Sequence, residues 1–569
     1  MKIIFVTGGV ISGVGKGIAT ASIAKILQQY GYTVTCVKID PYINYDAGTL
    51  RPTEHGEVWV TDDGGEIDQD LGNYERFLGF QLPKINNITT GQIYKELIDK
   101  EREGEFLGQT VEVIPHVPNE IKRRIIEAGK GYDFTVVEVG GTVGDYQNLP
   151  YLFAAKGMEH DIGKDSVAYV LVTYLPVPTS IGEMKTKPTQ QAIRMLNEAG
   201  IFPDFVLCRA PVALDDVRKK KLEANANIRM DHVISAPDVN DIYDVPMNFE
   251  KEEFGKKILR RFNMVPLKEP DWTRWNTLVN NINNPSRTIR IAMVGKYIDI
   301  GNFSLTDSYI SVNQSVLHAS AEFAAKTEIE WIDAKRIEKE GTHILDNFSG
   351  VIVPGGFGAT GIEGKIMAIE YARKNNVPFL GLCYGLQMAV IEYARNACNM
   401  KDANTTEVDP DTRFPVIDIL PAQKSIISQS RYGASMRLGA YAAILKDSSV
   451  VLNLYKRTGR FDEDMKRVKE LQNSDQSFRL GFLDSYYNII LERHRHRYEV
   501  NPEFVRNLEE NGLVFSGFHH REDGTKLMEF VELPNHKFFI ATQAHPEFKS
   551  RLGNPSPLFY GFIEACLKE

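Results

Sequence analysis

The 569-residue chain has few cysteines and no long apolar run. Its five cysteines stand singly, without the paired spacing of a zinc site or a disulfide framework, so we expect a reducing compartment. The most apolar segment, residues 166–177, is shorter than the roughly 20 residues that span a membrane. The first residues lack the layout of a secretory signal. These absences favour a cytoplasmic protein.

An excess of basic charge is also absent. The formal net charge is -9, which argues against duplex nucleic acid as the main partner but allows a local basic cleft for nucleotides. Hydrophobic residues make up 43% and charged residues 25% of the chain, as is usual for globular proteins. We therefore expect small-molecule ligands.

Length and pattern predict two domains. One hydrophobic core stops growing at roughly 250 to 300 residues. Two series of β-branched runs alternate with helical patterns, which predicts two tandem three-layer α/β domains, each with a parallel sheet between helices. We expect an N-terminal domain over 1–266, a linker over 267–287 and a C-terminal domain over 288–569. The strongly charged segment 457–477 is expected to be a solvated insertion that is helical or loose and not catalytic. The predicted strands are 3–6, 33–39, 111–114, 134–139, 168–172 and 205–208 in the first domain, and 289–294, 329–332, 351–353 and 379–382 in the second.

A glycine-rich loop follows the first predicted strand. Residues 7–17 read TGGVISGVGKG, and a helical sequence comes next. Such a loop brings N–H groups close to phosphate oxygens, and Lys16 can reach the outer phosphates. The loop is not a strict P-loop, since Val10 takes the first glycine position and Gly17 stands where Ser or Thr would hold magnesium. A glycine-rich turn with an exposed lysine is the alternative.

Two acidic residues can supply the missing magnesium ligands. Asp70 lies in a polar loop, and Glu138 lies near the end of an apolar strand, at the sheet edge where open parallel sheets bind ligands. A carboxylate there is costly unless it is paired or bound to a metal. Taken alone, either acid is more often a helix cap or an ion-pair member.

Five strings then carry a family resemblance. GGVISGVGKG, VKIDPYIN, HGEVWVTDDGGEIDQDLGNYERF, VVEVGGTVGDYQNLP and KTKPTQ resemble, in this order, the P-loop NTPase-like synthetase domain of CTP synthases. The resemblance implies catalytic roles for Lys16 and Lys38 on ATP phosphates and magnesium binding by Asp70 and Glu138. It implies ATP contacts from Ser12, Gly13, Val14, Gly15, Lys16, Gly17, Asp70, Asp238 and Val239, and UTP or CTP contacts from Ser12, Asp145, Tyr146, Gln147, Lys185, Thr186, Lys187, Pro188, Thr189, Gln190 and Lys221. The run from Lys185 to Gln190 also offers two cations just before a helix, which suits a triphosphate, although alone it would read as a basic helix start.

The second domain carries three elements of a thiol enzyme. Cys383 lies between a predicted strand and a predicted helix, the geometry of a nucleophile elbow, where a helix N-terminus favours the reactive thiolate. The PGGFG run at 354–358 can direct N–H groups at an oxyanion. His545 can move a proton, and Glu547, two residues on, can orient its ring.

These elements together resemble class I glutamine amidotransferases, and ERHRHRYEVN at 492–501 resembles the CTP synthase subgroup. Without that context, the His-Arg run would read as a metal or phosphate patch. The resemblance implies that Cys383, His545 and Glu547 release ammonia from glutamine. It implies glutamine contacts from Gly356, Tyr384, Gly385, Leu386, Gln387, Glu407 and Arg497.

The resemblance also implies the whole reaction and its partners. ATP would phosphorylate the 4-oxygen of UTP, and channelled ammonia would replace it to give CTP, with CTP as inhibitor and GTP as activator. A homotetramer, with filaments possible in addition, is implied as well. Thr360 and Ile310 stand where relatives commonly have arginine and lysine, so we expect weak or altered GTP activation.

Two other functions fit parts of the sequence. A cobyrinate amide synthase would share the phosphate loop and the glutaminase, but its acceptor is a carboxylate on a corrinoid, which the KTKPTQ run and Lys221 disfavour. An ATP-switched assembly protein with a dead glutaminase would show a broken elbow or missing acids, and the sequence has neither. Filament formation is compatible with catalysis.

Overall fold

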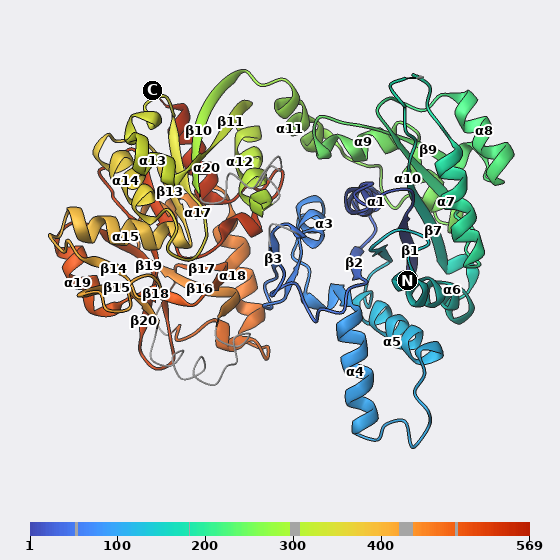
Figure 1. Cartoon of the computed structure of the whole chain (residues 1–569), viewed down its shortest axis with the longest axis horizontal. Helices are drawn as coiled ribbons and strands as arrows, with labels where there is room; N and C mark the ends of the chain where they lie inside the picture. Colours follow the sequence, from blue (N-terminus) through green and yellow to red (C-terminus); the bar gives the residue numbers. More distant parts are fainter. Residues whose placement is uncertain (52–54, 181, 296–307, 420–435, 484–486, 569) are drawn as a thin grey trace. The chain divides into compact units, whose positions relative to one another are not determined.

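The computed structural model describes the chain except residues 52–54, 181, 296–307, 420–435, 484–486 and 569 (Figure 1). The chain divides into two compact units. Unit 1 comprises Met1–Thr49 and Glu66–Val279, and unit 2 comprises Leu50–Gly65 and Asn280–Glu569. A short N-terminal stretch therefore belongs to the C-terminal unit. The helix α11 (Thr273–Asn283) occupies part of the predicted linker.

Unit 1 is built on a seven-stranded parallel sheet with the order β5-β2-β6-β1-β7-β8-β9. Because the first strand lies in the middle and later strands flank it on both sides, the loop after it opens at the switch point of the sheet, where α/β folds bind ligands. The strands are β1 (Lys2–Gly8), β2 (Val34–Asp40), β5 (Asn87–Thr89), β6 (Phe134–Val139), β7 (Val167–Tyr174), β8 (Phe205–Ala210) and β9 (Val233–Pro237), and the short β4 (Glu66–Asp68) lies outside this sheet.

Helices cover both faces of this sheet. Ile3 and Phe5 point to one face and share a core with helices α4 to α8, while α1 packs with α3, α9 and α10. Alternating strand residues supply the two cores, because successive side chains point to opposite faces. The helices are α1 (Lys16–Gln29), α3 (Asp70–Leu78), α4 (Thr90–Arg102), α5 (Val113–Ala128), α6 (Leu149–Ile162), α7 (Lys187–Glu198), α8 (Asp216–Ala226), α9 (Val245–Glu250) and α10 (Phe254–Arg261).

Unit 2 contains a nine-stranded mixed sheet with the order β11-β10-β12-β13-β21-β20-β19-β16-β17. The first five of these strands are parallel and the rest antiparallel. The strands of this sheet are β10 (Arg287–Gly295), β11 (Ala325–Asp333), β12 (Gly350–Val353), β13 (Phe379–Leu382), β16 (Arg437–Leu445), β17 (Ile489–His496), β19 (Val514–His520), β20 (Lys526–Glu532) and β21 (Phe539–Thr542). A separate small sheet consists of β14 (Ala403–Thr405), β15 (Phe414–Ile419) and β18 (Tyr498–Val500). The short strand β3 (Val58–Val60) of the N-terminal stretch belongs to neither of these sheets.

Two hydrophobic cores lie on opposite faces of the unit 2 sheet. Helices α13, α14, α15 and α19 contribute to one core, and α12, α17 and α20 contribute to the other. The three-layer α/β prediction is therefore confirmed for both units. The helices are α12 (Ile310–Glu322), α13 (Ala334–Glu340), α14 (Ile362–Lys374), α15 (Tyr384–Asn396), α17 (Val450–Arg457), α18 (Arg460–Leu471), α19 (Pro502–Glu510) and α20 (Pro557–Leu567).

One predicted strand is wrong, and the predicted insertion is more tightly packed on one side than expected. The strand predicted over 111–114 is instead a connection into helix α5. Its β-branched residues are followed by Val117, Ile121 and Ile125, whose helical spacing buries one face in the core. The insertion over 457–477 forms helix α18 and is largely exposed, as expected, but one side of α18 is buried. Arg460 and Asp464 are buried there, and Asp464 accepts from the backbone N–H of Leu491 at 3.1 Å.

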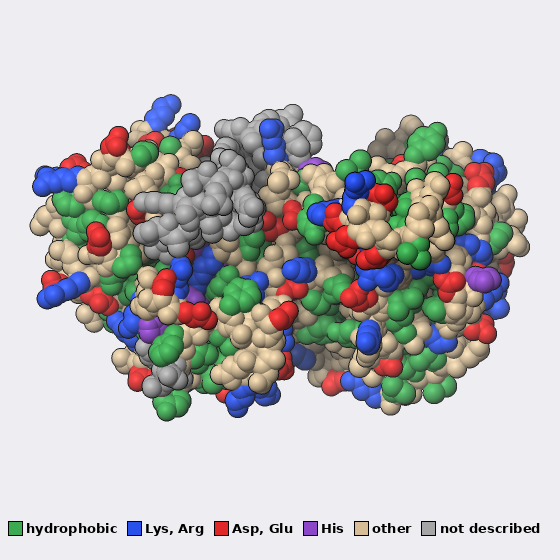
Figure 2. Space-filling model, turned by 90° about the horizontal axis from the view of Figure 1, so that it is seen from below, with side chains coloured by type: hydrophobic (Ala, Val, Ile, Leu, Met, Phe, Trp, Pro, Cys, Tyr) green, Lys and Arg blue, Asp and Glu red, His purple; other side chains and the backbone are tan. Residues whose placement is uncertain are grey.

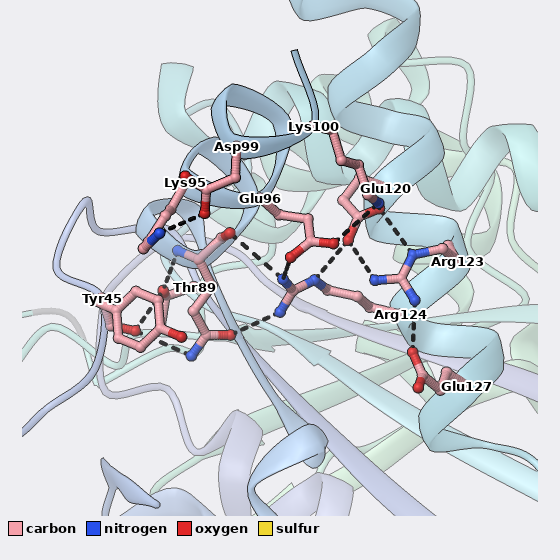
Figure 3. A network of polar contacts seen from close by, with 11 residues as sticks. Tyr45, Thr89, Lys95, Glu96, Asp99, Lys100, Glu120, Arg123, Arg124 and Glu127 are labelled. Carbon is pink, nitrogen blue, oxygen red and sulfur yellow. Dashed lines mark hydrogen bonds and ion pairs between the residues drawn. The ribbon is translucent and has the colours of Figure 1, made fainter. Parts of the chain in front are cut away.

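Hydrogen bonds and ion pairs between charged side chains connect α4 to α5 (Figure 3). The buried carboxylate of Glu120 accepts hydrogen bonds from Arg123 at 2.6 and 2.9 Å and from Arg124 at 2.9 Å. Arg124 also donates to Gln92 of α4 at 3.1 Å, and Lys100 of α4 reaches Glu120 at 3.3 Å. Despite burial, which acts in the opposite direction, these cations lower the pKa of Glu120 to about 2.

The surface carries mixed charges. On the face drawn in Figure 2, basic, acidic and apolar side chains of the described residues are interspersed. The end of α4 and the chain just after it are exposed and carry three glutamates, Glu101, Glu103 and Glu105. Among the described residues, no helix combines the length and the apolar character that crossing a membrane requires.

The Glu120 cluster predicts a pH-dependent contribution to stability. At pH 7, Glu120→Gln should lower the free energy of unfolding of unit 1 by about 1 to 3 kcal/mol, since a buried acceptor of three cations loses its charge. A carboxylate with a depressed pKa contributes fully above its ordinary value of 4.5 and loses the contribution as pH falls toward about 2. Calorimetry at several pH values should therefore show wild type and variant converging over that window.

Glu127→Gln is the matched control. Glu127 also pairs with Arg123, at 2.7 Å, but both side chains are about half exposed, so the loss should stay below about 1 kcal/mol. An equal effect of the two substitutions, or a Glu120→Gln effect that does not change with pH, would contradict the stabilising role of the buried cluster.

Candidate functional site

The phosphate loop of unit 1 connects β1 to α1. Gly13 and Gly15 adopt φ values of 70° and 93°, which favour glycine, and Gly15 caps the helix. Lys16 begins α1, folds back over Gly8 at the end of β1, and donates to the carbonyl of Gly141 at 2.7 Å. Burial lowers the pKa of Lys16. The loop, the helix N-terminus and the lysine are thus arranged to receive an anion.

Three charged side chains meet beside this loop. Lys38, at the end of β2, is hydrogen-bonded to Asp70 at the start of α3 and lies 3.4 Å from Glu138 at the end of β6. Tyr74, one turn after Asp70, donates to Glu138. A Cβ on Gly17 would lie 2.4 Å from a carboxylate oxygen of Asp70, so glycine at this position leaves the room that the acid occupies.

Burial and charge act against each other in this cluster. Burial would lower the pKa of Lys38, but Asp70, Glu138 and Asp40 raise it well above its ordinary value. Burial raises the pKa of Glu138, whereas Lys38 overcomes burial and lowers that of Asp70. Burial also raises the pKa of Asp68 to about 7. Such opposed shifts in one cluster of charged side chains are typical of functional sites.

The donor set fits a magnesium ion that binds together with phosphates. Asp70 and Glu138 both approach Gly17 at the loop, and Mg²⁺ commonly takes one or two carboxylates, water and substrate phosphates rather than an all-protein cage. The described residues contain no group of three or more His, Cys, Asp and Glu side chains able to hold a metal on their own. Phosphates would therefore complete the coordination.

A cavity of about 160 Å³ adjoins the loop. Val14, Gly15, Asp238 and Val239, four of the predicted ATP contacts, line it. Its lining also includes Arg209, which sequence reasoning missed. Arg209 donates to Asp238 at 2.8 Å and to the carbonyl of Gly13 at 3.3 Å. Ser12 and Gly13 are exposed in the loop outside the lining.

The residues predicted to bind UTP form two groups. In the first, Lys185 pairs with Glu183 at 3.0 Å, and Lys221 helps to lower the pKa of Glu183, for which the hydrogen bond from Lys185 is the main cause. Thr189 is buried against Thr173 at 3.1 Å. Lys187 and Pro188 open α7, whereas Thr186 is its cap and Gln190 bonds to the Thr186 hydroxyl at 3.2 Å.

The second group lies at the start of α6. Asp145 accepts from the N–H of Thr142 at 2.7 Å and is close enough to influence the pKa of Lys16. Tyr146 and Gln147 instead line a separate cavity of about 720 Å³ with α4, α5 and α6. Within unit 1, therefore, these two residues and the phosphate loop line different cavities.

The thiol of unit 2 lies on a tight turn. Cys383 follows β13 with φ 49° and ψ -100°, and α15 begins at the next residue. A Cβ on Gly385 would lie 2.2 Å from the carbonyl of Val353, so glycine permits the close packing of the turn. Gln543, another residue that sequence reasoning missed, directs its amide at the sulfur at 3.6 Å. This is the strained geometry of a nucleophile elbow.

His545 and Glu547 follow β21. The ring nitrogen Nδ1 of His545 lies 2.7 Å from Glu547 Oε1, and the ring stacks on Phe548 with centroids 5.3 Å apart. Burial would lower the pKa of His545, but Cys383 and Glu547 raise it well above its ordinary value. A Cβ on Gly355 would contact both His545 and Cys383, so all three surround one small space.

The predicted glutamine contacts lie around this space, with one exception. Tyr384 donates to the carbonyl of Gly358 at 2.9 Å, whose N–H donates to Glu407 at 2.9 Å. Glu407 and Arg497 both influence the pKa of Tyr498, which burial raises. Gln387 donates to the Tyr498 carbonyl at 3.1 Å, and a Cβ on Gly356 would lie 3.9 Å from both Lys365 and Tyr384. The exception is Leu386, whose side chain is in the core.

Loss of the Glu547 carboxylate should impair the histidine and leave the thiol in place. Because Glu547 helps to keep His545 protonated and oriented, Glu547→Gln should lower kcat for glutamine hydrolysis on the order of 100-fold and should lower the pKa of His545. Steady-state kinetics and NMR titration of the histidine measure the two effects. An unchanged rate with an unchanged titration would contradict this role.

The comparisons with known proteins match both parts of the chain. A family model of the CTP synthase N-terminus matches residues 2–264, and a model of class-I glutamine amidotransferases matches residues 304–565. Curated CTP synthases of Pyrococcus abyssi and Methanocaldococcus jannaschii are each 47% identical to this chain, over 99% and 100% of it and over 98% and 99% of their own lengths. A solved glutaminase domain of Trypanosoma brucei CTPS with bound acivicin is 32% identical over 49% of this chain and 94% of its own, with a TM-score of 0.41.

Full-length similarity at this level covers the synthetase and the amidotransferase parts together. It excludes a cobyrinate amide synthase and a non-enzymatic assembly protein as the primary assignment, because curated relatives that match throughout this chain are CTP synthases. The chain therefore belongs to the CTP synthase family, the glutamine-hydrolysing ligases of pyrimidine biosynthesis that join a synthetase domain to a class I glutamine amidotransferase domain.

Proposed function

We propose that unit 1 binds ATP and UTP side by side and phosphorylates the 4-oxygen of UTP, so that ammonia displaces phosphate and gives CTP. The observation that carries this proposal is the buried cluster of Lys38, Asp70 and Glu138 beside the phosphate loop. Lys16 and Lys38 would hold the phosphates and offset the charge that spreads over the transferring phosphoryl group. Arg209 and Asp238 would border the adenine, in the cavity that they line.

Mg²⁺ is the metal proposed for this site, held by Asp70 and Glu138. When bound, it would offset charge on the β- and γ-phosphates of ATP. The chain's own residues position the partners. Lys185 and Lys221 would face the triphosphate of UTP, since both lie near Glu183. Lys185 precedes α7, and Lys221 is in α8.

Unit 2 would supply the ammonia. The Cys383 thiolate attacks the amide carbon of glutamine, and His545 protonates the departing ammonia, which leaves a thioester. His545 then takes a proton from water, which attacks the thioester and frees glutamate and the thiol. The N–H groups of Gly356 and Tyr384 would stabilise the oxyanion. Because free ammonia is protonated at neutral pH and then unreactive, we propose that it reaches UTP without release to bulk water.

Family membership also suggests the regulation and assembly of the enzyme. We propose a cytoplasmic homotetramer, with CTP as inhibitor at a site that includes Asp145, Tyr146 and Gln147. Tyr146 is 90% exposed and lines a cavity away from the phosphate loop of its own chain. A neighbouring subunit is therefore the proposed source of the phosphate loop that Tyr146 and Gln147 face, whereas Asp145 lies near Lys16 of its own chain.

Substitutions in the two units should separate the two reactions. With UTP, ATP and magnesium, Cys383→Ala should abolish CTP formation from glutamine but retain it from an ammonium salt, because only ammonia release needs the thiol. Lys16→Ala should lower both by on the order of 100-fold or more, because both need the phosphoryl transfer. The uracil-to-cytosine absorbance change measures the product. Loss of the ammonium-dependent reaction in a folded Cys383→Ala enzyme would contradict this division of labour.

The residues at 310 and 360 predict the response to GTP. Ile310 and Thr360 replace two cations that relatives commonly carry, so GTP should stimulate glutamine-dependent turnover weakly, by about twofold or less, because each missing ion pair costs affinity for a triphosphate. The measurement is a GTP titration with glutamine as nitrogen source. Ile310→Lys with Thr360→Arg should strengthen the response, and strong, saturable stimulation of the wild type would refute the prediction.

A further inference from the structure

A short segment from the first part of the sequence packs into the glutaminase unit. It comprises residues 57–62 and contains β3, and it lies within the stretch Leu50–Gly65 that belongs to unit 2, although Met1–Thr49 and Glu66–Val279 belong to unit 1. By sequence it lies inside the stretch that matches the CTP synthase N-terminus rather than the amidotransferase. Trp59 at its centre is fully buried. The catalytic steps described above use none of its side chains.

The first contact of this segment reaches the ring of the catalytic histidine. Trp59 packs edge-on against Phe548, with ring centroids 5.1 Å apart. Phe548 stacks on His545, with centroids 5.3 Å apart and planes 22° from parallel. Phe548 is itself buried. Since densely packed rings leave little free volume, the position of the indole sets how far the imidazole can tilt away from Glu547.

The second contact reaches the backbone of the same histidine. Asp62 accepts from Arg493 Nε at 2.6 Å, and the carbonyl of Arg493 accepts from the backbone N–H of His545 at 2.7 Å. Arg493 is fully buried. Burial alone would raise the pKa of Asp62, but Arg493 and Lys549 hold it below its usual value. The Asp62 carbonyl also accepts from Ala440 of β16 at 2.9 Å, which fixes the turn.

The third contact reaches the catalytic carboxylate. Glu57 accepts from the N–H of Ser311 at 3.1 Å and from its hydroxyl. The carbonyl of Ser311 accepts from the hydroxyl of Ser315 at 2.7 Å, and the same hydroxyl lies 3.3 Å from the carbonyl of Glu547. Ser311 and Ser315 are both fully buried on α12. The N-terminus of that helix thus connects the segment to the residue that orients the histidine.

Three sets of contacts therefore converge on residues 545–548. We propose that residues 57–62 are a positioning element of the glutaminase, which holds His545 and Glu547 in register with Cys383. Cys383 itself is fixed by its own elbow between β13 and α15, so the segment controls the histidine side of the pair. A displacement of about 1 Å between reacting groups can cost on the order of 100-fold in rate, which makes this support matter for kcat.

The test uses the full-length enzyme and three substitutions, one for each set of contacts. They are Trp59→Ala, Asp62→Asn and Ser315→Ala, and each is measured for glutamine hydrolysis and for CTP formation from an ammonium salt. The first two should lower kcat for glutamine hydrolysis at least tenfold and the third about threefold. KM for glutamine should stay within threefold, and the ammonium-dependent reaction within twofold. Trp59→Phe should recover most of the lost rate, because a ring still fills the contact with Phe548.

Phe562→Ala is the matched control. It also removes a fully buried ring from unit 2, but Phe562 packs against Phe538 and none of the contacts above involves it. Its folded form should hydrolyse glutamine within twofold of wild type. If Trp59→Ala does not fold, Asp62→Asn and Ser315→Ala, which barely change shape, decide the question.

Three results would overturn the proposal. One is glutamine hydrolysis within twofold of wild type in folded Asp62→Asn and Trp59→Ala. Another is an equal loss in Phe562→Ala, which would reduce the effect to general destabilisation. The last is a parallel fall of the ammonium-dependent reaction. The proposal rests on the assigned glutaminase, and a wild-type enzyme that does not hydrolyse glutamine would instead overturn that assignment.

Discussion

The pairing of buried charges is the constraint on which both sites depend. Lys38 is almost fully buried, and only the carboxylates around it, Asp70 and Glu138 above all, keep it charged. Asp70 begins α3 and Glu138 lies near the end of β6, so the sheet must be assembled correctly before the charges offset one another. An isolated charge would cost several kcal/mol at such depth. The same cluster that folding has to satisfy is the one that we propose exchanges its internal partners for the phosphates and metal of a nucleotide.

The glutaminase follows the same logic with a histidine. His545 is held between Cys383 and Glu547, which keep it protonated against burial. That arrangement needs the His545 ring to keep one orientation. Trp59 and Asp62 help to hold the ring, although both lie outside the range 304–565 that matches the amidotransferase family. A domain boundary drawn from sequence families therefore differs from the boundary drawn by packing. The amidotransferase chemistry belongs to the C-terminal half, whereas part of its mechanical support belongs to the N-terminal half.

Local patterns made much of this predictable. Glu138 at a strand end and Cys383 between a strand and a helix are both written in short, contiguous stretches, and each lies where its pattern indicates. The strand predicted over 111–114 failed because a β-branched run can also begin an amphipathic helix. The role of Arg209 was not foreseeable, since its partners, Gly13 and Asp238, are distant in sequence. The contact of Trp59 with Phe548 could not be predicted either, because nothing in the sequence around Trp59 indicates contact with a residue almost 500 positions later.

The central claim is that one chain moves nitrogen from glutamine onto a uridine whose 4-oxygen has first been phosphorylated. Isotope tracing tests it most directly. The enzyme is given ATP, magnesium, glutamine labelled with ¹⁵N in the amide, and UTP labelled with ¹⁸O at position 4, in the presence of unlabelled ammonium. Mass spectrometry should find ¹⁵N in the amino group of CTP and ¹⁸O in inorganic phosphate. Release of ¹⁸O into water, or CTP that carries only unlabelled nitrogen, would contradict the claim.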